Sequence, residues 1–301
     1  MIKTIRYKDI DFVKYAECLS NSSQNTDFAE RKFLDIVTDK QWFLLVSGDY
    51  DAVMPVPFVR KWLIKFVIMP KLCPQLGVFS VVDNSSLNQG FYEYLTRHFL
   101  VASYTFNSGN KLVTNLSRKT SFQIPRESYE CVKKKYSKNR RRNIRINDKL
   151  SKNISFRSFL ENTDKDFFIR NMLGNKNKLE SKIYLRLCEK LSASQFGSFK
   201  VLLYNGETQS IVYLFEGKAR CYLSIFINER DLKNKNIPSL MIDRCIQEYI
   251  DAKDFDFVGS EIPAIAEFNQ RFGAVSYQYP VIHNSKFRLL QLLWERIKNY
   301  P

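Results

Sequence analysis

Four arginines fall within six residues near the middle of this 301-residue chain: Arg140, Arg141, Arg142 and Arg145. A guanidinium group is planar and always charged, and it contacts phosphate through paired hydrogen bonds better than a lysine ammonium does. If the segment is helical, Arg141 and Arg145 share a face because they are four residues apart. These side chains therefore predict a site for an anionic substrate, such as a phosphorylated, nucleotide-linked or tRNA-linked molecule.

The positive charge of the chain is concentrated around these arginines. The net charge is +16, from 47 Lys and Arg against 31 Asp and Glu, and residues 132–152 contribute +9 of it, with ten basic side chains and one acidic one. A helix built only for stability would alternate Glu and Lys four residues apart. A solvated linker helix is the alternative interpretation of such a charge run.

Other side chains that can take part in chemistry lie in the second half of the chain. Glu261 follows a short apolar segment, in a loop position that commonly carries function, and can act as a general base toward an attacking amine. Ser260 and Glu261 also fit the N-cap and the first turn of the next helix. The Tyr277 phenol can protonate a leaving group, or only pack. Tyr222 and Ser224 share one face of a strand along which a donor can lie.

Several kinds of chemistry lack the residues that they need. With only His98 and His283, and six scattered cysteines without a CxxC pair, we expect no metal site. The GxSxG, P-loop and HExxH patterns of hydrolases, NTPases and zinc proteases are missing from the sequence.

Hydrophobic residues make up 45% of the chain and aromatic residues 14%, which excludes a disordered protein. Without a signal peptide or an apolar run of about 20 residues, we expect a soluble cytoplasmic protein with reduced thiols and no membrane span.

The arginines belong to a segment, residues 127–152, whose pattern predicts one continuous helix. Steps of three and four residues place apolar side chains and two asparagines on one stripe. The members of this stripe are Tyr129, Val132, Tyr136, Asn139, Asn143, Ile146 and Leu150. Pro125 marks the boundary before the helix.

The following part, residues 153–301, alternates helices and strands. Helices are predicted over 164–172, 180–191, 238–252 and 263–272, the last with Gly273 as its C-cap. Strands are predicted over 198–204, 209–215, 219–227, 255–259 and 275–282, with a hairpin turn at Asn205-Gly206. The order is two helices, a three-strand meander, helix, strand, helix, strand.

The first part, residues 1–126, mixes the same kinds of element. Strands are predicted over 42–47, 52–58 and 62–69, and a helix over 91–104. Pro55 and Pro57 favour an edge or bulged strand.

The order of elements resembles the GNAT acyltransferase fold, and specific residues add to this. Phe255-Asp256-Phe257-Val258-Gly259-Ser260, followed by Ala266 to Ala274, is similar to the strand, helix and "xxFNxxFGA" ending of that family. Tyr136 to Arg145 resembles the "SxxxRxxIR" helix between the halves of tandem GNAT proteins, which include the Fem-type peptidyltransferases and related uncharacterised bacterial acyltransferases. The resemblance implies a mixed α/β chain with a degenerate GNAT-like domain (1–126), a basic connecting helix (127–152) and a C-terminal GNAT-like domain (153–301).

The resemblance also implies roles for further residues. In that family the strand after the meander diverges from the last meander strand and opens a slot, and Asn269 matches the helix that follows the slot. The stretch that would hold the pyrophosphate of coenzyme A, residues 228–239, contains no glycine, although Lys233 and Lys235 can contact phosphate and Ser239 lies at the start of the next helix. Fem-type relatives use aminoacyl-tRNA as donor. We therefore expect acyl-CoA or aminoacyl-tRNA as a co-substrate, and no permanently bound cofactor.

Two functions follow from these features. The first is an acyltransferase that moves an acyl or aminoacyl group from a thioester or ester to an amine, mainly by positioning and preorganised electrostatics. The second is a non-catalytic GNAT-like protein that binds RNA or another anionic partner.

Overall fold

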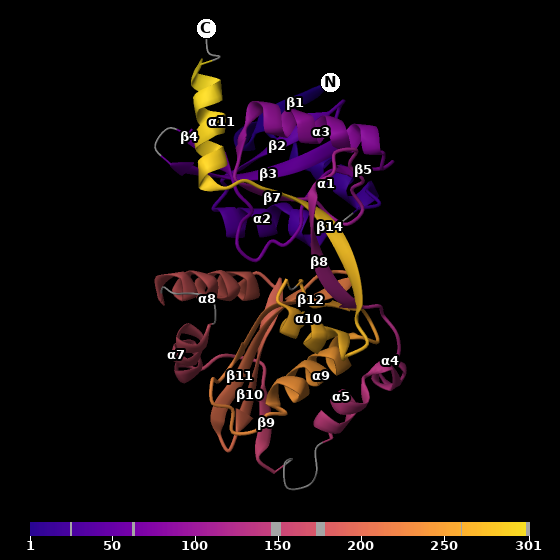
Figure 1. The fold of residues 1–301 in the computed structure, drawn as a ribbon, viewed down its shortest axis with the longest axis vertical. Helices are drawn as coiled ribbons and strands as arrows, with labels where there is room; N and C mark the ends of the chain where they lie inside the picture. Colours follow the sequence, from indigo (N-terminus) through magenta and orange to yellow (C-terminus); the bar gives the residue numbers. More distant parts are fainter. Residues whose placement is uncertain (25, 62–63, 146–151, 173–177, 260, 299–301) are drawn as a thin grey trace. The chain divides into compact units, whose positions relative to one another are not determined.

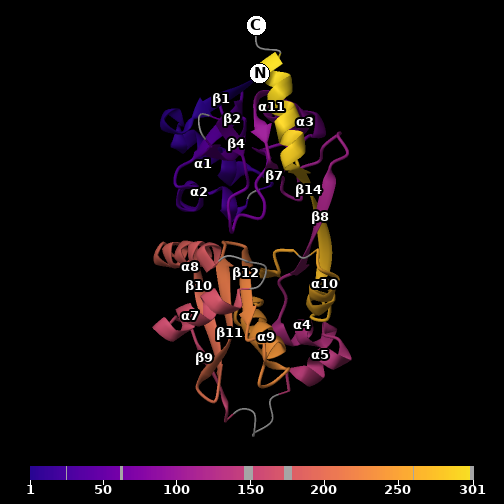
Figure 2. The same cartoon turned by 60° about the vertical axis from the view of Figure 1, so that its left-hand side comes forward.

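The chain folds into two compact units, which we call unit 1 (Met1–Lys119 with Gln278–Pro301) and unit 2 (Thr120–Tyr277). The computed structural model describes residues 1–24, 26–61, 64–145, 152–172, 178–259 and 261–298. The chain enters unit 2 inside strand β8 (Ser117–Ile124) and leaves it inside β14 (Val275–His283), as can be followed in Figures 1 and 2.

These units group the chain differently from the expected ranges 1–126, 127–152 and 153–301. The basic segment belongs to unit 2, and Gln278–Pro301 belongs to unit 1. Strand pairing is the physical reason, because β14 continues past unit 2 and pairs antiparallel with β7 (Ser103–Thr105), Val281 opposite Thr105.

Unit 1 is a mixed sheet with helices. Its strands and helices in chain order are β1 (Ile2–Arg6), α1 (Phe12–Asn21), α2 (Arg31–Thr38), β2 (Trp42–Ser47), β3 (Ala52–Lys61), β4 (Ile64–Val67), β5 (Phe79–Ser80), α3 (Ser85–His98), β6 (Leu100–Val101), β7, and, after unit 2, α11 (Lys286–Lys298). The strand order is β1-β2-β3-β4-β6, with β5 beside β3. The first four strands are antiparallel, and β6 returns parallel to β4 after α3.

Unit 2 repeats this order. Its elements are α4 (Tyr129–Lys135), α5 (Lys138–Asn143), β9 (Ile154–Arg157), α7 (Asn162–Asn171), α8 (Lys178–Ala193), β10 (Gly197–Tyr204), β11 (Glu207–Glu216), β12 (Arg220–Asn228), α9 (Ile237–Tyr249), β13 (Asp254–Asp256) and α10 (Pro263–Gln270). Strands β9 to β12 are antiparallel, and β13 returns parallel to β12 after α9. The two units therefore share one βαβ plan, and the expected mixed α/β fold with two similar halves is confirmed.

The predicted meander of unit 2 is confirmed, and its local causes are visible. Asn205 and Gly206 both have positive φ (51° and 76°), which gives the tight turn whose twist matches an antiparallel hairpin. Residues Gln209 to Phe215 of β11 are all buried, because α9 covers one face of the sheet and α7 and α8 the other (Figure 2). On the α9 face, Val212 and Leu214 join a core with Leu240 and Met241.

The basic segment is not one continuous helix. Tyr136 has extended dihedrals (φ −60°, ψ 142°) and ends α4, and Ser137 then caps α5 by accepting a hydrogen bond from the Arg140 N–H at 3.2 Å. The amide of Ser137 donates instead to the carbonyl of Arg271 at 2.9 Å, which ties the break to the end of α10. Ile146 and Leu150, the last members of the expected stripe, lie outside the described residues.

Two predictions for unit 1 need correction. The helix predicted over 91–104 is α3, which ends at His98 and is followed by the short strands β6 and β7. Strand β3 is an inner strand in spite of Pro55 and Pro57, which pair with Leu44 and Trp42 of β2. Both prolines are tolerated because, on the opposite side, β5 pairs only with residues 52–53 and β4 only with residues 58–61.

Within the described ranges, no helix is long and apolar enough to cross a membrane. Over the same residues, no group of three or more His, Cys, Asp or Glu side chains could hold a metal ion. All six cysteines are free thiols, and five of them are buried.

Candidate functional site

The central feature of unit 2 is the divergence of β12 from β13. The two strands pair only from Arg220 opposite Asp254 to Tyr222 opposite Asp256, and beyond that point β12 continues to Asn228 paired with β11 but not with β13. A cavity of about 630 Å³ lies where they separate, and we call it the β12–β13 cavity. Among its lining residues are Arg140, Leu223, Ser224, Asn228, Lys235, Ser239, Val258, Gly259, Phe268, Asn269 and Arg271.

A β-bulge lies at the edge of this cavity. In the register between β11 and β12, Leu214 is opposite Leu223 and Tyr213 is opposite Ile225, so Ser224 has no partner on β11. A bulge leaves the extra residue outside the ladder and redirects it, and bulges are common beside active sites. Ser224, expected to face a donor, therefore lines the cavity at an irregular point of the strand.

Arg140 is the buried member of the arginine cluster. Its Nη1 donates to Ser239 Oγ and its Nη2 donates to the Phe268 carbonyl at 3.1 Å, while the guanidinium lies 4.1 Å from the centroids of the Phe268 and Phe272 rings. Burial, and then the nearby Arg271, lower the pKa of Arg140 to about 10. Arg140 therefore stays charged at neutral pH and joins the start of α9 to α10.

The β12–β13 cavity is suited to an anion. Arg140, Lys235 and Arg271 line it, and its described lining residues include no carboxylate. The buried Arg140 Nε and Asn228 Oδ1 have no hydrogen-bond partner among the described residues. Buried polar atoms are nearly always paired, so these two are exceptions among the residues that line the cavity.

The wall of the cavity at the end of β13 has an unusual backbone. Val258 and the following Gly259 both have positive φ, 57° and 84°. For a β-branched residue this conformation is a genuine outlier, and such strain concentrates at functional sites. The Val258 N–H donates to Asp256 Oδ1 at 2.8 Å, so a buried carboxylate holds this turn.

Asp256 is the centre of a network that the sequence analysis missed as a site. It also accepts hydrogen bonds from Ser121 Oγ (3.0 Å), Arg220 Nη1 (3.1 Å) and the Tyr277 hydroxyl (2.7 Å). Burial raises the pKa of the Asp256 carboxyl, and Arg220 is the largest opposing influence. One signal was available in the sequence, because Asp254 and Asp256 alternate around Phe255 and must share a face of their strand.

Two tyrosines that we expected at the site lie beside this network, because the Arg220 guanidinium is 5.9 Å from the ring centroid of each. The Tyr277 hydroxyl donates a hydrogen bond to Asp256, and burial followed by the Asp256 charge raises the pKa of Tyr277, which makes the phenol a weaker acid. Tyr222 is buried, with its ring 5.8 Å from that of Phe215.

The site residues that we predicted around α10 differ in burial and in their position relative to the cavity. Asn269 is buried and lines the cavity. Glu261 is exposed, in the turn between the lining residues Gly259 and Ala264. Ser260 lies outside the described residues.

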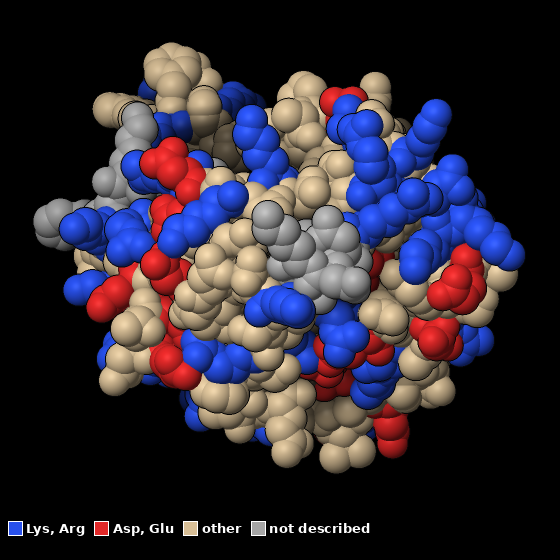
Figure 3. Space-filling view, turned by 90° about the horizontal axis from the view of Figure 1, so that it is seen from below, with Lys and Arg blue, Asp and Glu red and all other residues tan. Residues whose placement is uncertain are grey.

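The other three arginines, Arg141, Arg142 and Arg145, are exposed. With Lys134, Lys135 and Lys138 they form a basic surface on α4, α5 and the residues just after α5, which we call the α4–α5 surface. Figure 3 shows Lys and Arg side chains gathered on the side of unit 2 on which Figure 1 draws these helices. The four arginines thus divide into one buried group at the cavity and three solvent-exposed groups.

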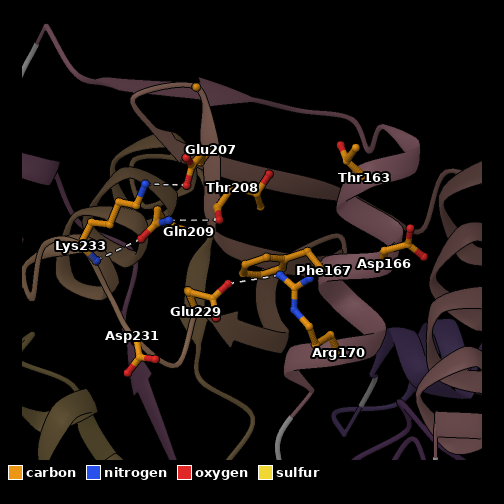
Figure 4. Close-up of a pocket in the computed structure, with 11 residues that line it drawn as sticks. Thr163, Asp166, Phe167, Arg170, Glu207, Thr208, Gln209, Glu229, Asp231 and Lys233 are labelled. Carbon is orange, nitrogen blue, oxygen red and sulfur yellow. Dashed lines mark hydrogen bonds and ion pairs between the residues drawn. The ribbon is translucent and has the colours of Figure 1, made fainter.

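Lys233 and Lys235 are not at one site. Lys235 and Ser239 line the β12–β13 cavity, whereas Lys233 lines a separate cavity of about 710 Å³ between α7, the β10–β11 turn and the segment after β12 (Figure 4). There Lys233 Nζ is 2.6 Å from Glu207 and Arg170 is 3.4 Å from Glu229. These lining charges are paired with each other, so Lys233 is not placed to meet a ligand of the β12–β13 cavity.

Comparisons by sequence find no matching family model and no matching curated protein. Comparison of structures finds matches along the whole chain. FemX has a TM-score of 0.63 at 10% identity, covering 99% of this chain and 100% of its own. The chain therefore has the GNAT-like fold that FemX shows.

Two further structures share this fold. A tandem GNAT protein from the clavulanic acid biosynthesis pathway has a TM-score of 0.54 at 8% identity, covering 93% of this chain and 97% of its own. L-PGS from Bacillus licheniformis has a TM-score of 0.51 at 9% identity, covering 97% and 98%. The tandem arrangement of this GNAT-like fold is visible here as two repeats of one strand order, β1-β2-β3-β4-β6 in unit 1 and β9-β10-β11-β12-β13 in unit 2.

Proposed function

We propose that the protein is an acyltransferase that moves an acyl or aminoacyl group from an ester or thioester to an amine in the β12–β13 cavity. The observation that carries this proposal is the cavity itself: it opens where two parallel strands diverge, three cationic side chains line it, and its described lining has no carboxylate. Such a lining favours an anionic donor through Coulomb attraction in a partly desolvated site.

The chemistry requires the amine nitrogen to attack the carbonyl carbon, which places negative charge on the carbonyl oxygen. Beyond Tyr222, β12 no longer pairs with β13, and Ser224 has no register partner on β11, so backbone N–H groups here can serve that oxygen. The amine proton passes to water or to Glu261, and the leaving oxygen or sulfur takes up a proton as it departs. Alignment of the two reactants then supplies most of the rate.

The segment between β12 and α9 supports a donor other than coenzyme A. Amides there donate inside the protein, as Lys233 N does to Gln209 (3.2 Å) and Asn236 N to Asn234 (2.9 Å). Ile237 N donates to the Asn234 carbonyl (3.1 Å), and Pro238 has no N–H. A pyrophosphate cradle needs such amides to be available. We therefore propose aminoacyl-tRNA, with the α4–α5 surface contacting its phosphates.

Donor binding and turnover test this proposal. The purified protein is titrated with coenzyme A, acetyl-CoA and aminoacyl-tRNA, and amine-dependent loss of the aminoacyl ester is then followed. We expect salt-sensitive tRNA binding and ester consumption, with no thermal shift from coenzyme A.

Two triple variants sharpen the test. Arg141→Ala/Arg142→Ala/Arg145→Ala should weaken binding and lower the salt dependence, by about 0.7–0.9 in slope for each phosphate that the variant no longer neutralises. Lys182→Ala/Arg186→Ala/Lys190→Ala removes the same charge from exposed positions of α8 and should change neither. Equal effects of the two variants would contradict a specific α4–α5 surface.

The second function, a non-catalytic RNA-binding protein, is favoured by the same α4–α5 surface. It predicts salt-sensitive RNA binding without ester consumption for any aminoacyl group. That result would overturn the enzyme proposal while leaving the basic surface in place.

A further inference from the structure

The last described helix, α11 of unit 1, carries an apolar face that the structure leaves in solvent. The exposed fractions are 71% for Phe287, 56% for Leu290, 64% for Trp294 and 60% for Ile297. Their spacing of three, four and three residues places them on one stripe. Four large side chains on one helix face form a continuous patch, which we call the α11 stripe.

The opposite face of α11 is attached to unit 1. Arg296 donates through Nη2 to the carbonyls of Thr96 (3.2 Å) and Arg97 (3.0 Å), and through Nη1 to that of His98 (3.2 Å). It thereby caps the C-terminal end of α3. Leu289, Leu292 and Leu293 on the same face are half-buried. Because this face is held, a simple rotation of the helix would not bury the α11 stripe without breaking these contacts.

The charges around the α11 stripe identify what it fits. At 100° per residue, Lys286 and Lys298 lie on either side of the stripe, and the helix carries four basic residues against the single acidic Glu295. Long basic side chains beside an apolar face can extend to lipid headgroups while their stems stay on the apolar surface. A tryptophan on such a face suits the boundary between acyl chains and headgroups.

We propose that α11 is an interfacial helix that docks the protein onto an anionic lipid bilayer. The α11 stripe enters the boundary between headgroups and acyl chains, and Lys286 and Lys298 contact lipid phosphates. A second copy of the chain fits less well, because two α11 stripes packed antiparallel would bring Lys286 of one near Lys298 of the other. The net charge of +16 on the whole chain acts in the same direction as the helix charges.

Vesicle sedimentation with the full chain tests the proposal. Vesicles of equal parts phosphatidylcholine and phosphatidylglycerol should bind the protein, and pure phosphatidylcholine vesicles should bind it more weakly. In a Trp62→Phe background, binding should shift Trp294 fluorescence to shorter wavelength, whereas the buried Trp42 should not respond. The double variant Phe287→Ser/Trp294→Ser should lose binding on the order of tenfold for each aromatic side chain.

A matched control distinguishes the loss of the α11 stripe from a general loss of exposed apolar surface. Val13→Ser changes a side chain of α1 in the same unit that is 69% exposed, and it should leave binding unchanged. Lys286→Gln/Lys298→Gln should lower binding to the anionic vesicles by about fivefold for each charge and leave the weak phosphatidylcholine binding as it was.

The proposal is overturned if the aromatic double variant binds vesicles as the unchanged protein does, or if neither binds. It is also overturned if light scattering without lipid shows a dimer that Trp294→Ser dissociates, because a second copy would then cover the α11 stripe. Unchanged thermal midpoints of the variants would show that they remain folded, as expected for exposed positions.

Discussion

At the scale of single residues, one buried carboxylate joins four parts of unit 2. Asp256 accepts hydrogen bonds from Ser121, Arg220, Tyr277 and the Val258 amide, and it holds Val258 in its strained conformation. Its function is positional, because it supports the turn that forms one wall of the β12–β13 cavity.

Asp256→Ala should destabilise the protein by about 3 kcal/mol, because it leaves a guanidinium and an amide without their buried acceptor. Urea unfolding measures this. Asp254→Ala is the control: that carboxylate also pairs with Arg220 but is about a third exposed (31%), so its loss should cost about 1 kcal/mol or less. Equal losses for the two variants would contradict the central position of Asp256.

A second carboxylate, the half-buried Asp243, makes stability depend on pH. Burial raises the pKa of Asp243, and its strongest opposing influence is the hydrogen bond from the Tyr129 hydroxyl, 2.9 Å from Oδ1. The folded protein therefore keeps a proton at pH values where the unfolded chain has lost it. The free energy of unfolding must then fall as pH rises from about 4 through the raised pKa.

Asp243→Asn removes this dependence, so the variant should gain stability relative to the unchanged protein as pH rises from about 4 to 7. Urea unfolding at several pH values in that window checks the slope. Tyr129→Phe should act in the opposite sense, because without the hydroxyl the pKa of Asp243 rises further. The free energy of unfolding should then continue to fall up to a higher pH. A pH-independent difference for Asp243→Asn would contradict the argument.

At the scale of elements, the connection between α4, α5 and α10 depends on one glycine. Gly273 has φ of +75°, and a Cβ there would lie 2.9 Å from Lys135 Cβ and 3.3 Å from the Lys135 carbonyl oxygen. Glycine is therefore needed for both the conformation and the close approach. This contact helps to place Arg140 over Phe268 and Phe272, so it bears on the cavity as well.

Gly273→Ala should cost about 2 kcal/mol or more, from the left-handed backbone together with the contact with Lys135. Gly206→Ala is the matched control, because Gly206 also has a positive φ (+76°) but nothing lies within 4 Å of its Cβ position. It should cost about 1 kcal/mol. Thermal unfolding of both variants compares the two costs, and equal losses would show that the contact with Lys135 does not matter.

At the scale of the whole molecule, residues Gln278–Pro301 fold together with the first part of the chain, as part of unit 1. Val281 pairs with Thr105, the Phe106 amide donates to the Pro280 carbonyl at 3.0 Å, and Asn284 Nδ2 donates to the Val101 carbonyl at 2.8 Å. Unit 2 is a continuous segment whose two ends both lie next to unit 1 residues in the chain. Loss of the last residues should therefore affect unit 1.

A truncation after Tyr277 should loosen unit 1 and leave unit 2 folded. Hydrogen exchange should show faster exchange in β7 and its neighbours, while β10 to β12 keep their protection. A truncation after Ser285 removes α11 but retains the pairing of β14 with β7. It should raise the exchange rates in β7 and its neighbours much less than the truncation after Tyr277 does. Greater loss of protection in β10 to β12 than in β7 would contradict this division of the chain.

Local patterns in the sequence were sufficient to predict most elements, because hydrophobic period and turn chemistry act over a few residues. They predicted β2 with the bounds Trp42–Ser47, the meander β10 to β12, the Asn205-Gly206 turn and the start of α9 to within one residue, at Pro238 where the structure has Ile237. They also located the arginines. The β12–β13 cavity was expected only through the family resemblance.

The tertiary structure decided everything that depends on which distant segments meet. It separated Arg140, buried between α9 and α10, from the exposed Arg141 and Arg142 on the same short helix and from Arg145 just after it. It placed Lys233 and Lys235 in different cavities. It also assigned Gln278–Pro301 to unit 1 and surrounded Asp256 with donors. Hydrophobic periodicity predicts which face of a helix or strand is apolar, but it does not predict which other element packs on that face. That choice depends on sheet order and on contacts between residues more than a hundred positions apart, such as Ser121 and Asp256.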